Sequence, residues 1–158
     1  MSAPLPDLHG YVGKSITDLC SNHYDTPSQS HCAHFVSHVL NIKLGTLCGD
    51  MAFKTRRTGA SIRCNELFNL LNDRGRWEER QATVDGLLIF VTSAKNVVNN
   101  FMRDAPQKHV GIYYGGRVYN FSNGHHRVVV DPTVDEFHNK FKHVYRGGDI
   151  SLFYGVAP

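Results

Sequence analysis

The sequence predicts an α+β fold in which N-terminal helices pack on a C-terminal antiparallel β-sheet. Apolar residues recur at helical spacing in the first half of the chain, whereas apolar and polar residues alternate between glycine turns in the second half. Helices followed by a run of strands are typical of α+β domains. The 158 residues contain no repeat, low-complexity tract or linker, so we expect a single domain over residues 1–158.

Composition narrows the functional class. The chain is 41% hydrophobic and 20% charged, and its 17 basic and 14 acidic residues give a net charge of +3. This balance is too weakly basic to indicate nucleic-acid binding. No apolar run is long enough to span a membrane. The segment Met1–Asp7 lacks the basic and apolar regions of a signal peptide, so we expect synthesis in the cytoplasm, with any export by a dedicated system.

The first half contains one strong helical pattern. Apolar residues at positions 32, 35, 36, 39 and 40 predict a helix packed on a core. We expect it to end near Gly45, because glycine readily takes the left-handed conformation that ends many helices. The other expectations for this half are an irregular arm over 1–10, a short helix over 14–22, a basic loop over 46–59 and a helix over 61–71.

The second half is predicted to be mostly strands. Residues 86–92 form a continuous apolar run, which is typical of a central buried strand. Gly115-Gly116 separates two alternating segments and predicts a hairpin with a two-residue turn. The expected elements are strands over 86–92, 109–114, 117–121, 127–130 and 150–154, a long loop over 93–108 and a short helix over 134–141.

Cys32 is the candidate nucleophile. Ser28 or Ser30 is suited to cap the helix, which would place Cys32 in the first turn. There the free backbone N–H groups and the positive end of the helix dipole stabilise a thiolate, the reactive form of cysteine. The alternative is an inert buried cysteine, which is the commoner role of a free thiol.

A cysteine nucleophile needs a base and a group that orients the base. His109 begins a predicted strand directly after a polar loop, so its ring can reach a pocket at the end of the sheet. Asn120 lies on the return strand of the same hairpin, where its amide can fix the tautomer of the histidine. The ordered set of Cys32, His109 and Asn120 therefore favours a catalytic cysteine over an inert one.

A metal site is the less favoured interpretation of the other cysteines and histidines. Cys20, Cys32, Cys48 and Cys64 contain no C-x-x-C pair and match no common zinc spacing. Three histidines share one face of the predicted helix, at positions 31, 34 and 38. We interpret them as a solvated polar face opposite the apolar stripe, with a metal site as the alternative.

These segments resemble those of the NlpC-type cell-wall cysteine peptidases, a family with a papain-like fold. The family's cysteine opens a helix in a pattern similar to residues 31–36, and its His-Val-Gly-Ile-Tyr strand matches residues 109–113. The apolar run at 86–91 is similar to its central strand. The resemblance extends from about residue 14 to residue 154.

The chain departs from the family at several positions. The family usually has aspartate before the cysteine and Ser-Gly after it, where this chain has His31 and Ala33-His34, and Leu87 replaces an acidic residue at the start of the central strand. The third catalytic residue of the family is often histidine rather than asparagine. Four other residues are therefore alternatives to Asn120 in this role: Ser122, Asn123, His125 and Asp131.

The resemblance implies cleavage of amide bonds in the peptide stems of peptidoglycan, with Cys32, His109 and Asn120 as catalytic residues and without a metal or other cofactor. We expect the residues just before the nucleophile, Gln29, Ser30 and His31, to contact the substrate. The backbone N–H of Cys32 is the expected first donor to the oxyanion, with Tyr24 or Gln29 as a second donor.

A compact chain of this kind also resembles the amidase effectors that bacteria inject through type VI secretion. That resemblance implies an antibacterial toxin that acts in the periplasm of the target cell, with a cognate immunity protein as its partner. Two alternatives remain open. One is a different Cys-His enzyme, either an acyltransferase of the transglutaminase type or a peptidase with a non-wall substrate. The other is an inactive NlpC-like binding module.

Overall fold

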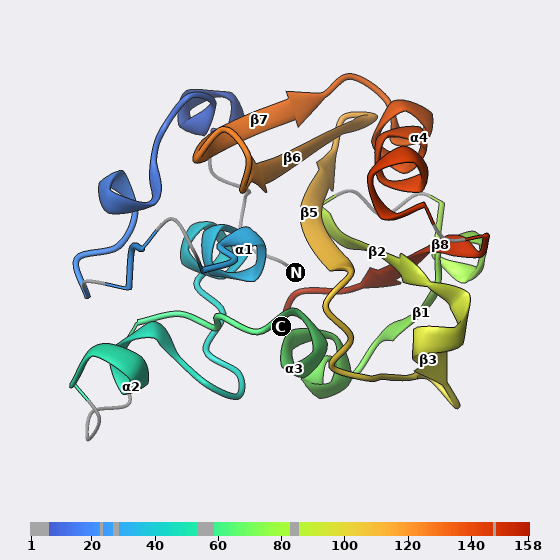
Figure 1. Ribbon diagram of the computed structural model, residues 1–158, viewed down its shortest axis with the longest axis horizontal. Helices are drawn as coiled ribbons and strands as arrows, with labels where there is room; N and C mark the ends of the chain where they lie inside the picture. The colour runs from blue at the N-terminus through green and yellow to red at the C-terminus, as the bar shows by residue number, and fades with distance from the viewer. Residues whose placement is uncertain (1–6, 23, 27–28, 54–58, 83–85, 147) are drawn as a thin grey trace.

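A computed structural model describes residues 7–22, 24–26, 29–53, 59–82, 86–146 and 148–158 of the chain (Figure 1). Its centre is an antiparallel six-stranded sheet with the order β1-β8-β2-β5-β6-β7. The strands are β1 Arg74–Arg76, β2 Leu87–Ser93, β5 Lys108–Tyr114, β6 Arg117–Ser122, β7 Arg127–Asp131 and β8 Ile150–Gly155, and a separate hairpin contains β3 Val97–Val98 and β4 Phe101–Met102. The helices are α1 Cys32–Leu40, α2 Cys48–Phe53, α3 Cys64–Leu70 and α4 Val134–Tyr145. The general α+β class and the antiparallel sheet are therefore confirmed.

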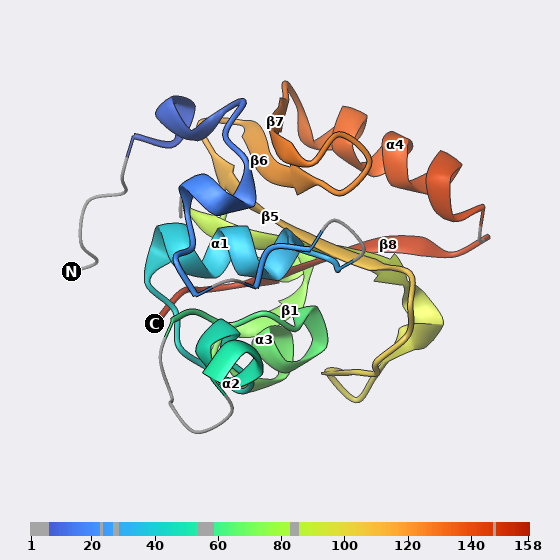
Figure 2. The ribbon, with the colours of Figure 1, turned by 60° about the vertical axis from the view of Figure 1, so that its left-hand side comes forward.

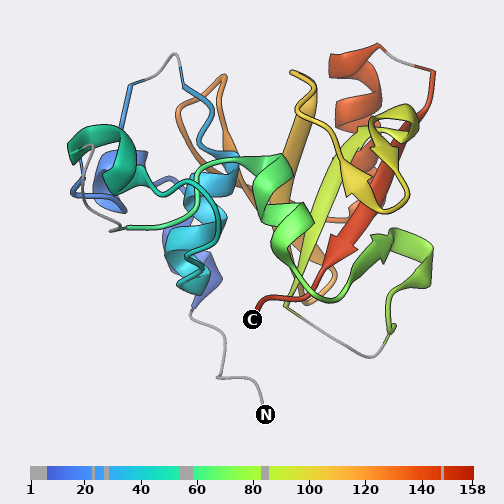
Figure 3. The ribbon, with the colours of Figure 1, turned by 90° about the horizontal axis from the view of Figure 1, so that it is seen from below.

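A separate hydrophobic core lies on each face of the sheet, and β2 contributes side chains to both. Leu88 and Phe90 belong to the core that includes residues of α1 and α3. Leu87, Ile89 and Val91 belong to the core under α4. The views in Figures 2 and 3 show α4 separated by the sheet from the other three helices. Both faces of β2 are covered, and its residues 87–91 are accordingly all apolar, as predicted.

The predicted hairpin of β5 and β6 is present. Gly115 and Gly116 form its turn, and both have positive φ, at 59° and 78°. Two consecutive residues with positive φ match the twist of the strands and favour glycine at both positions. The hairpin pairs Gly111 with Asn120, so the start of β5 and the end of β6 meet at one end of the sheet.

Several predicted boundaries in the first half are wrong. α1 ends at Leu40 rather than near Gly45, because Asn41 takes the left-handed conformation and donates its N–H to the Ser37 carbonyl. Asparagine adopts this conformation more easily than other non-glycine residues. The helix expected over 14–22 is a single 3₁₀ turn, Ile16–Asp18. The helix expected over 61–71 covers only Cys64–Leu70.

Other elements were not expected at all. α2 lies within the predicted loop 46–59, of which residues 54–58 are outside the described part of the chain. The predicted loop 93–108 contains a 3₁₀ turn, Ala94–Asn96, and the β3–β4 hairpin. The predicted helix 134–141 continues as α4 to Tyr145. Two further 3₁₀ turns are Leu8–Tyr11 and Trp77–Glu79. The first begins within the expected arm 1–10, of which residues 1–6 are outside the described part of the chain.

Among the described residues, no helix is both long and apolar enough to cross a membrane.

Candidate active site

Cys32 is the first residue of α1, and its side chain is almost completely buried. The residue before the helix is His31, which makes no side-chain capping hydrogen bond, so the expected cap by Ser30 is wrong. The other expected cap, Ser28, lies outside the described residues. Ser30 instead places its hydroxyl oxygen 3.5 Å from the Cys32 sulfur. The thiol therefore lies at the free N–H groups of the helix, with a polar neighbour.

His109 approaches Cys32 from the α4 side of the sheet. It is the second residue of β5 and alternates with Val110, which faces α1, so its ring lies on the α4 side. There it stacks on Phe141 of α4 with ring centroids 4.5 Å apart. It interacts with Cys32 at the end of the sheet, where β5 and α1 begin, and this interaction helps to lower the pKa of the thiol. The structure thus brings together two residues that are distant in sequence.

The tautomer of His109 follows from its neighbours. Asn120 places Oδ1 3.0 Å from Nε2 of His109, and its Nδ2 donates to a carboxylate oxygen of Asp131 at 2.9 Å. A carboxylate only accepts, so the amide orientation is determined, and Oδ1 must accept from an N–H at Nε2. Lys140 binds the same Asp131 oxygen at 2.7 Å. In the neutral ring, Nδ1 is consequently the nitrogen that is free to take a proton.

The electrostatics favour ionisation of Cys32 over its neighbour Cys64. Hydrogen bonding from Cys64, together with the charge and hydrogen bond of His109 and a bond to Ser30, holds the pKa of Cys32 well below that of a free thiol, although burial acts against this. Burial raises the pKa of Cys64 far above its usual value, and the nearby Cys32 sulfur raises it further. Cys64 therefore stays protonated and can donate to the Cys32 thiolate.

A cavity of about 380 Å³ opens at Cys32. Its lining includes Ser30, Cys64 and Tyr24 together with the cationic residues Arg63 and Lys108. Lys108 forms an ion pair of 2.7 Å with Asp104, which also lines the cavity. A larger hollow of about 730 Å³ lies beside β1, β8 and the first turns of α4, but no cysteine lines it. The smaller cavity is thus the one that gives access to the candidate nucleophile.

The residues expected to contact substrate have different positions. Ser30 is exposed and lines the cavity. Tyr24, an expected donor to the oxyanion, is half-buried and also lines the cavity. Gln29 is half-buried, and its side-chain oxygen accepts from the Thr26 hydroxyl at 2.6 Å. His31 is buried, and both its ring nitrogens bond within the protein, so its side chain faces away from the cavity.

The alternatives to Asn120 do not take its place beside His109. Asn123 bonds to the His31 backbone and to Ser30, and Ser122 accepts from the His125 backbone. Asp131 contributes to the site by accepting a hydrogen bond from Asn120, and it does not replace Asn120 beside His109. Sequence reasoning missed Cys64 and Lys140. Their roles come from contacts between elements that are distant in sequence, and neither residue belongs to a recognisable motif.

The interpretation of the helix histidines as a solvated face is wrong. His31 and His34 are buried, and His38 is half-buried. Tyr24, from the segment before the helix, covers them with its ring 5.6 Å from that of His31 and 5.3 Å from that of His34. Periodicity alone could not show this, because the covering segment has no regular structure of its own.

No family model, no curated protein and no solved structure matches this chain. Its function must therefore be inferred from its motifs and from the geometry of the site.

Proposed function

We propose that the protein is a cysteine hydrolase that cleaves an amide bond, with Cys32 as nucleophile, His109 as general base and acid, and Asn120 as the group that orients His109. The observation that supports this most is the tautomer of His109. Asp131 orients the amide of Asn120, and the amide in turn leaves Nδ1 of His109 as the proton acceptor. An inert buried cysteine has no need of a neighbouring base whose tautomer is determined in this way.

The mechanism follows from these positions. Nδ1 of His109 takes the thiol proton, and the thiolate of Cys32 attacks the carbonyl carbon of the amide. The backbone N–H of Cys32 at the start of α1 donates to the oxygen that becomes negative. His109 then gives its proton to the leaving amine, and a thioester remains on Cys32. Water attacks the thioester, with His109 again taking the proton, and the acid product and free thiol are released.

The proposed substrate is a peptide stem of peptidoglycan. This assignment rests on the resemblance of residues 31–36 and 109–113 to the cell-wall peptidases. The cavity is compatible with it, because stem peptides carry free carboxylates and Arg63 lines the cavity beside Cys32, whereas Lys108 is already paired with Asp104. Cations at the rim of a pocket attract and orient anionic groups. The papain-like form of the α+β fold belongs to the same proposal.

The test is mass spectrometry of purified peptidoglycan fragments after incubation with the wild-type protein and with Cys32→Ala. We expect new peptide fragments with the wild type and none with Cys32→Ala, and the fragment masses identify the bond. His109→Ala should lower the rate by roughly 10²- to 10⁴-fold, the usual contribution of a general base. The matched control is His143→Ala, which removes an exposed histidine of α4 and should cleave normally.

Equal cleavage by Cys32→Ala and the wild type would contradict the proposal. No cleavage by the wild type, with transfer of the acyl group to an added amine, would instead indicate an acyltransferase.

The proposed biological role is that of a secreted antibacterial effector with a cognate immunity protein. If the substrate lies in the cell wall, expression should be toxic only when the protein is directed to the periplasm, and Cys32→Ala should remove the toxicity. Equal toxicity from the cytoplasm would contradict a cell-wall target.

A further inference from the structure

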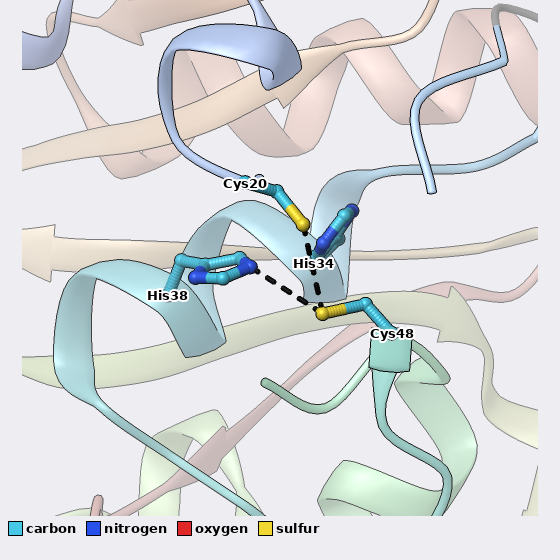
Figure 4. Close-up of side chains that lie close together, drawn as sticks. All are labelled: Cys20, His34, His38 and Cys48. Atoms are coloured by element: carbon cyan, nitrogen blue, oxygen red, sulfur yellow. Dashed lines mark hydrogen bonds between the residues drawn. The ribbon is translucent and has the colours of Figure 1, made fainter. Parts of the chain in front are cut away.

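We propose that Cys20, His34, His38 and Cys48 form a structural zinc site. Cys20 follows the 3₁₀ turn Ile16–Asp18, the two histidines lie one turn apart on α1, and Cys48 begins α2. One ligand atom from each residue lies within 4.8 Å of all the others. Figure 4 shows the four side chains directed toward one another from three separate segments. The proposal is independent of the proposed function, because the site contains neither Cys32 nor His109.

The distances fit a tetrahedral zinc site. The two sulfur atoms are 3.6 Å apart, and Nε2 of His38 is 3.6 Å from the sulfur of Cys48. With the usual Zn–S and Zn–N bond lengths, the edges of a tetrahedron are about 3.8 Å between two sulfurs and about 3.6 Å between sulfur and nitrogen. A zinc ion would therefore require little change in these two distances, and every other pair of ligand atoms lies within 4.8 Å.

His34 has the tautomer that a metal ligand needs. The carbonyl of Thr26 lies 2.9 Å from Nε2 of His31 and can only accept, so this nitrogen carries the proton. Nδ1 of His31 is then an acceptor, and Nδ1 of His34, 3.1 Å away, is the donor. The lone pair of His34 is left on Nε2, which is buried and has no hydrogen-bond partner among the described residues. Histidines that bind metal typically donate their other ring N–H to an acceptor, which fixes the tautomer in this way.

The surroundings of the sulfurs suit thiolates. Cys48 accepts from the side-chain amide of Asn22 at 3.2 Å and from the backbone N–H of Ala60 at 3.4 Å. Cys20 accepts from the backbone N–H of Asn22 at 3.4 Å. A Cβ atom at Gly59 would lie 2.1 Å from the Cys48 sulfur, so the chain passes close to the cluster where only glycine fits. Two thiolates also neutralise a divalent cation, which permits burial.

Four protein ligands indicate a structural site rather than a catalytic one, because a catalytic zinc keeps a position open for water or substrate. The ion would tie the N-terminal segment and α2 to α1. Apart from the ligands, the buried residues of this small cluster are limited to Ile62, with Tyr24 packed against it, within the described chain. So small an apolar cluster contributes little to holding these segments in place.

The test is metal analysis of the full-length protein, purified with a thiol reductant from zinc-supplemented cells. We expect about one zinc per chain, in keeping with one four-ligand site. Replacing zinc with Co²⁺ should give the visible absorption of tetrahedral cobalt together with a sulfur-to-cobalt charge-transfer band. This spectrum is measured on the wild-type protein, so it does not depend on the folding of any variant.

The variants Cys48→Ser and His38→Gln should lose zinc, and the matched controls Cys64→Ser and His143→Gln should retain it. Wild-type protein without zinc and without a cobalt spectrum would overturn the proposal. A Cys20–Cys48 disulfide in the reduced preparation would overturn it as well. Retention of full metal content by both Cys48→Ser and His38→Gln would place the ion elsewhere and would also contradict the proposal.

Discussion

Asp131 determines which nitrogen of His109 carries the proton, although the side chain of Asn120 lies between them. The carboxylate can only accept, so it orients the amide, and the amide orients the ring. Lys140 holds the carboxylate from α4. An active site can therefore depend on a residue that touches neither the nucleophile nor the base.

Asp131→Ala should lower kcat roughly tenfold, which corresponds to about 1.4 kcal/mol and lies within the strength of a charge-assisted hydrogen bond. Without the carboxylate, only the longer bond from Nδ2 of Asn120 to the Val118 carbonyl, at 3.3 Å, holds the amide in place. Rotation of the amide would present its N–H₂ group to Nε2, which favours the wrong tautomer of His109. KM should change little. The measurement is steady-state kinetics on a purified peptidoglycan fragment.

Two variants serve as controls for this prediction. Asp131→Asn keeps an oxygen that can accept from Asn120 and should retain most of the activity. Asp135→Ala removes an exposed carboxylate of α4 and should behave as the wild type. An unchanged kcat in Asp131→Ala would show that the bond from Asn120 to the Val118 carbonyl is sufficient to orient the amide.

The lowered pKa of Cys32 predicts thiol reactivity at a pH where an ordinary cysteine is protonated. A free thiol loses its reactive thiolate as the pH falls through about 8.5. Cys32 should remain reactive below this pH, and His109→Ala should move the midpoint upward because the stabilising charge is lost. The rate of iodoacetamide modification, followed on the Cys32 peptide across pH, tests this. Identical midpoints in wild type and variant would contradict it.

At the scale of single residues, the sequence was sufficient to nominate Cys32, His109 and Asn120, because each stands beside a local signal: a helix start, a strand start and a hairpin. It was not sufficient for the zinc ligands. Cys20 and Cys48 lie on either side of the histidines without a C-x-x-C pair, so a search based on cysteine spacing rejects them. Only the folded chain brings the four side chains together.

Among the elements, the β5–β6 hairpin places the base and the residue that orients it, and Gly111 allows the two strands to approach. A Cβ atom at Gly111 would lie 2.9 Å from the Tyr119 carbonyl oxygen and 3.0 Å from Cβ of Asn120. The glycine is two residues from His109 and directly opposite Asn120. The strand spacing at this position therefore influences the hydrogen bond between them.

Gly111→Ala should both destabilise the protein and reduce its activity. Overpacking of this kind costs typically about 1–3 kcal/mol of the free energy of unfolding, and displacement of Asn120 should lower kcat as well. The matched control is Gly124→Ala, where an added Cβ meets no atom within 4 Å. Urea unfolding and the cleavage rate provide the two measurements. A Gly111→Ala variant that matches the wild type in both would contradict this account.

Elements were predictable from sequence where their signals are local. The Gly115-Gly116 turn and the apolar run of β2 depend on neighbouring residues, and both were predicted. β1 is a three-residue strand with the sequence Arg-Gly-Arg, which forms only because β8 pairs with it. α2 follows an isolated bridge between Leu47 and Ser61 and lies within a segment of mixed composition. Such elements form through pairing with segments that are distant in sequence, so their own residues show no clear helix or strand pattern.

Across the whole molecule, the proposed zinc ion would link the segment that contains Cys20 to α1 and α2. Removing it with a chelator should lower Tm by on the order of 10 °C, since a tightly bound ligand stabilises a domain by several kcal/mol. Zinc should restore Tm and magnesium should not, because magnesium prefers oxygen ligands. Differential scanning calorimetry measures the shift. An unchanged Tm in protein shown to be free of metal would contradict a structural role.

The meander of β5, β6 and β7 contains His109, Asn120 and Asp131, whereas Cys32 comes from a helix that rests against the opposite face of the sheet. The proposed base and its orienting groups thus come from one meander, and the proposed nucleophile comes from the other face of the sheet. Ala33, Phe35 and Val36 of α1 are fully buried in the core on that face. A core substitution that shifts this helix would therefore change the distance between the thiol and its proposed base without touching either residue.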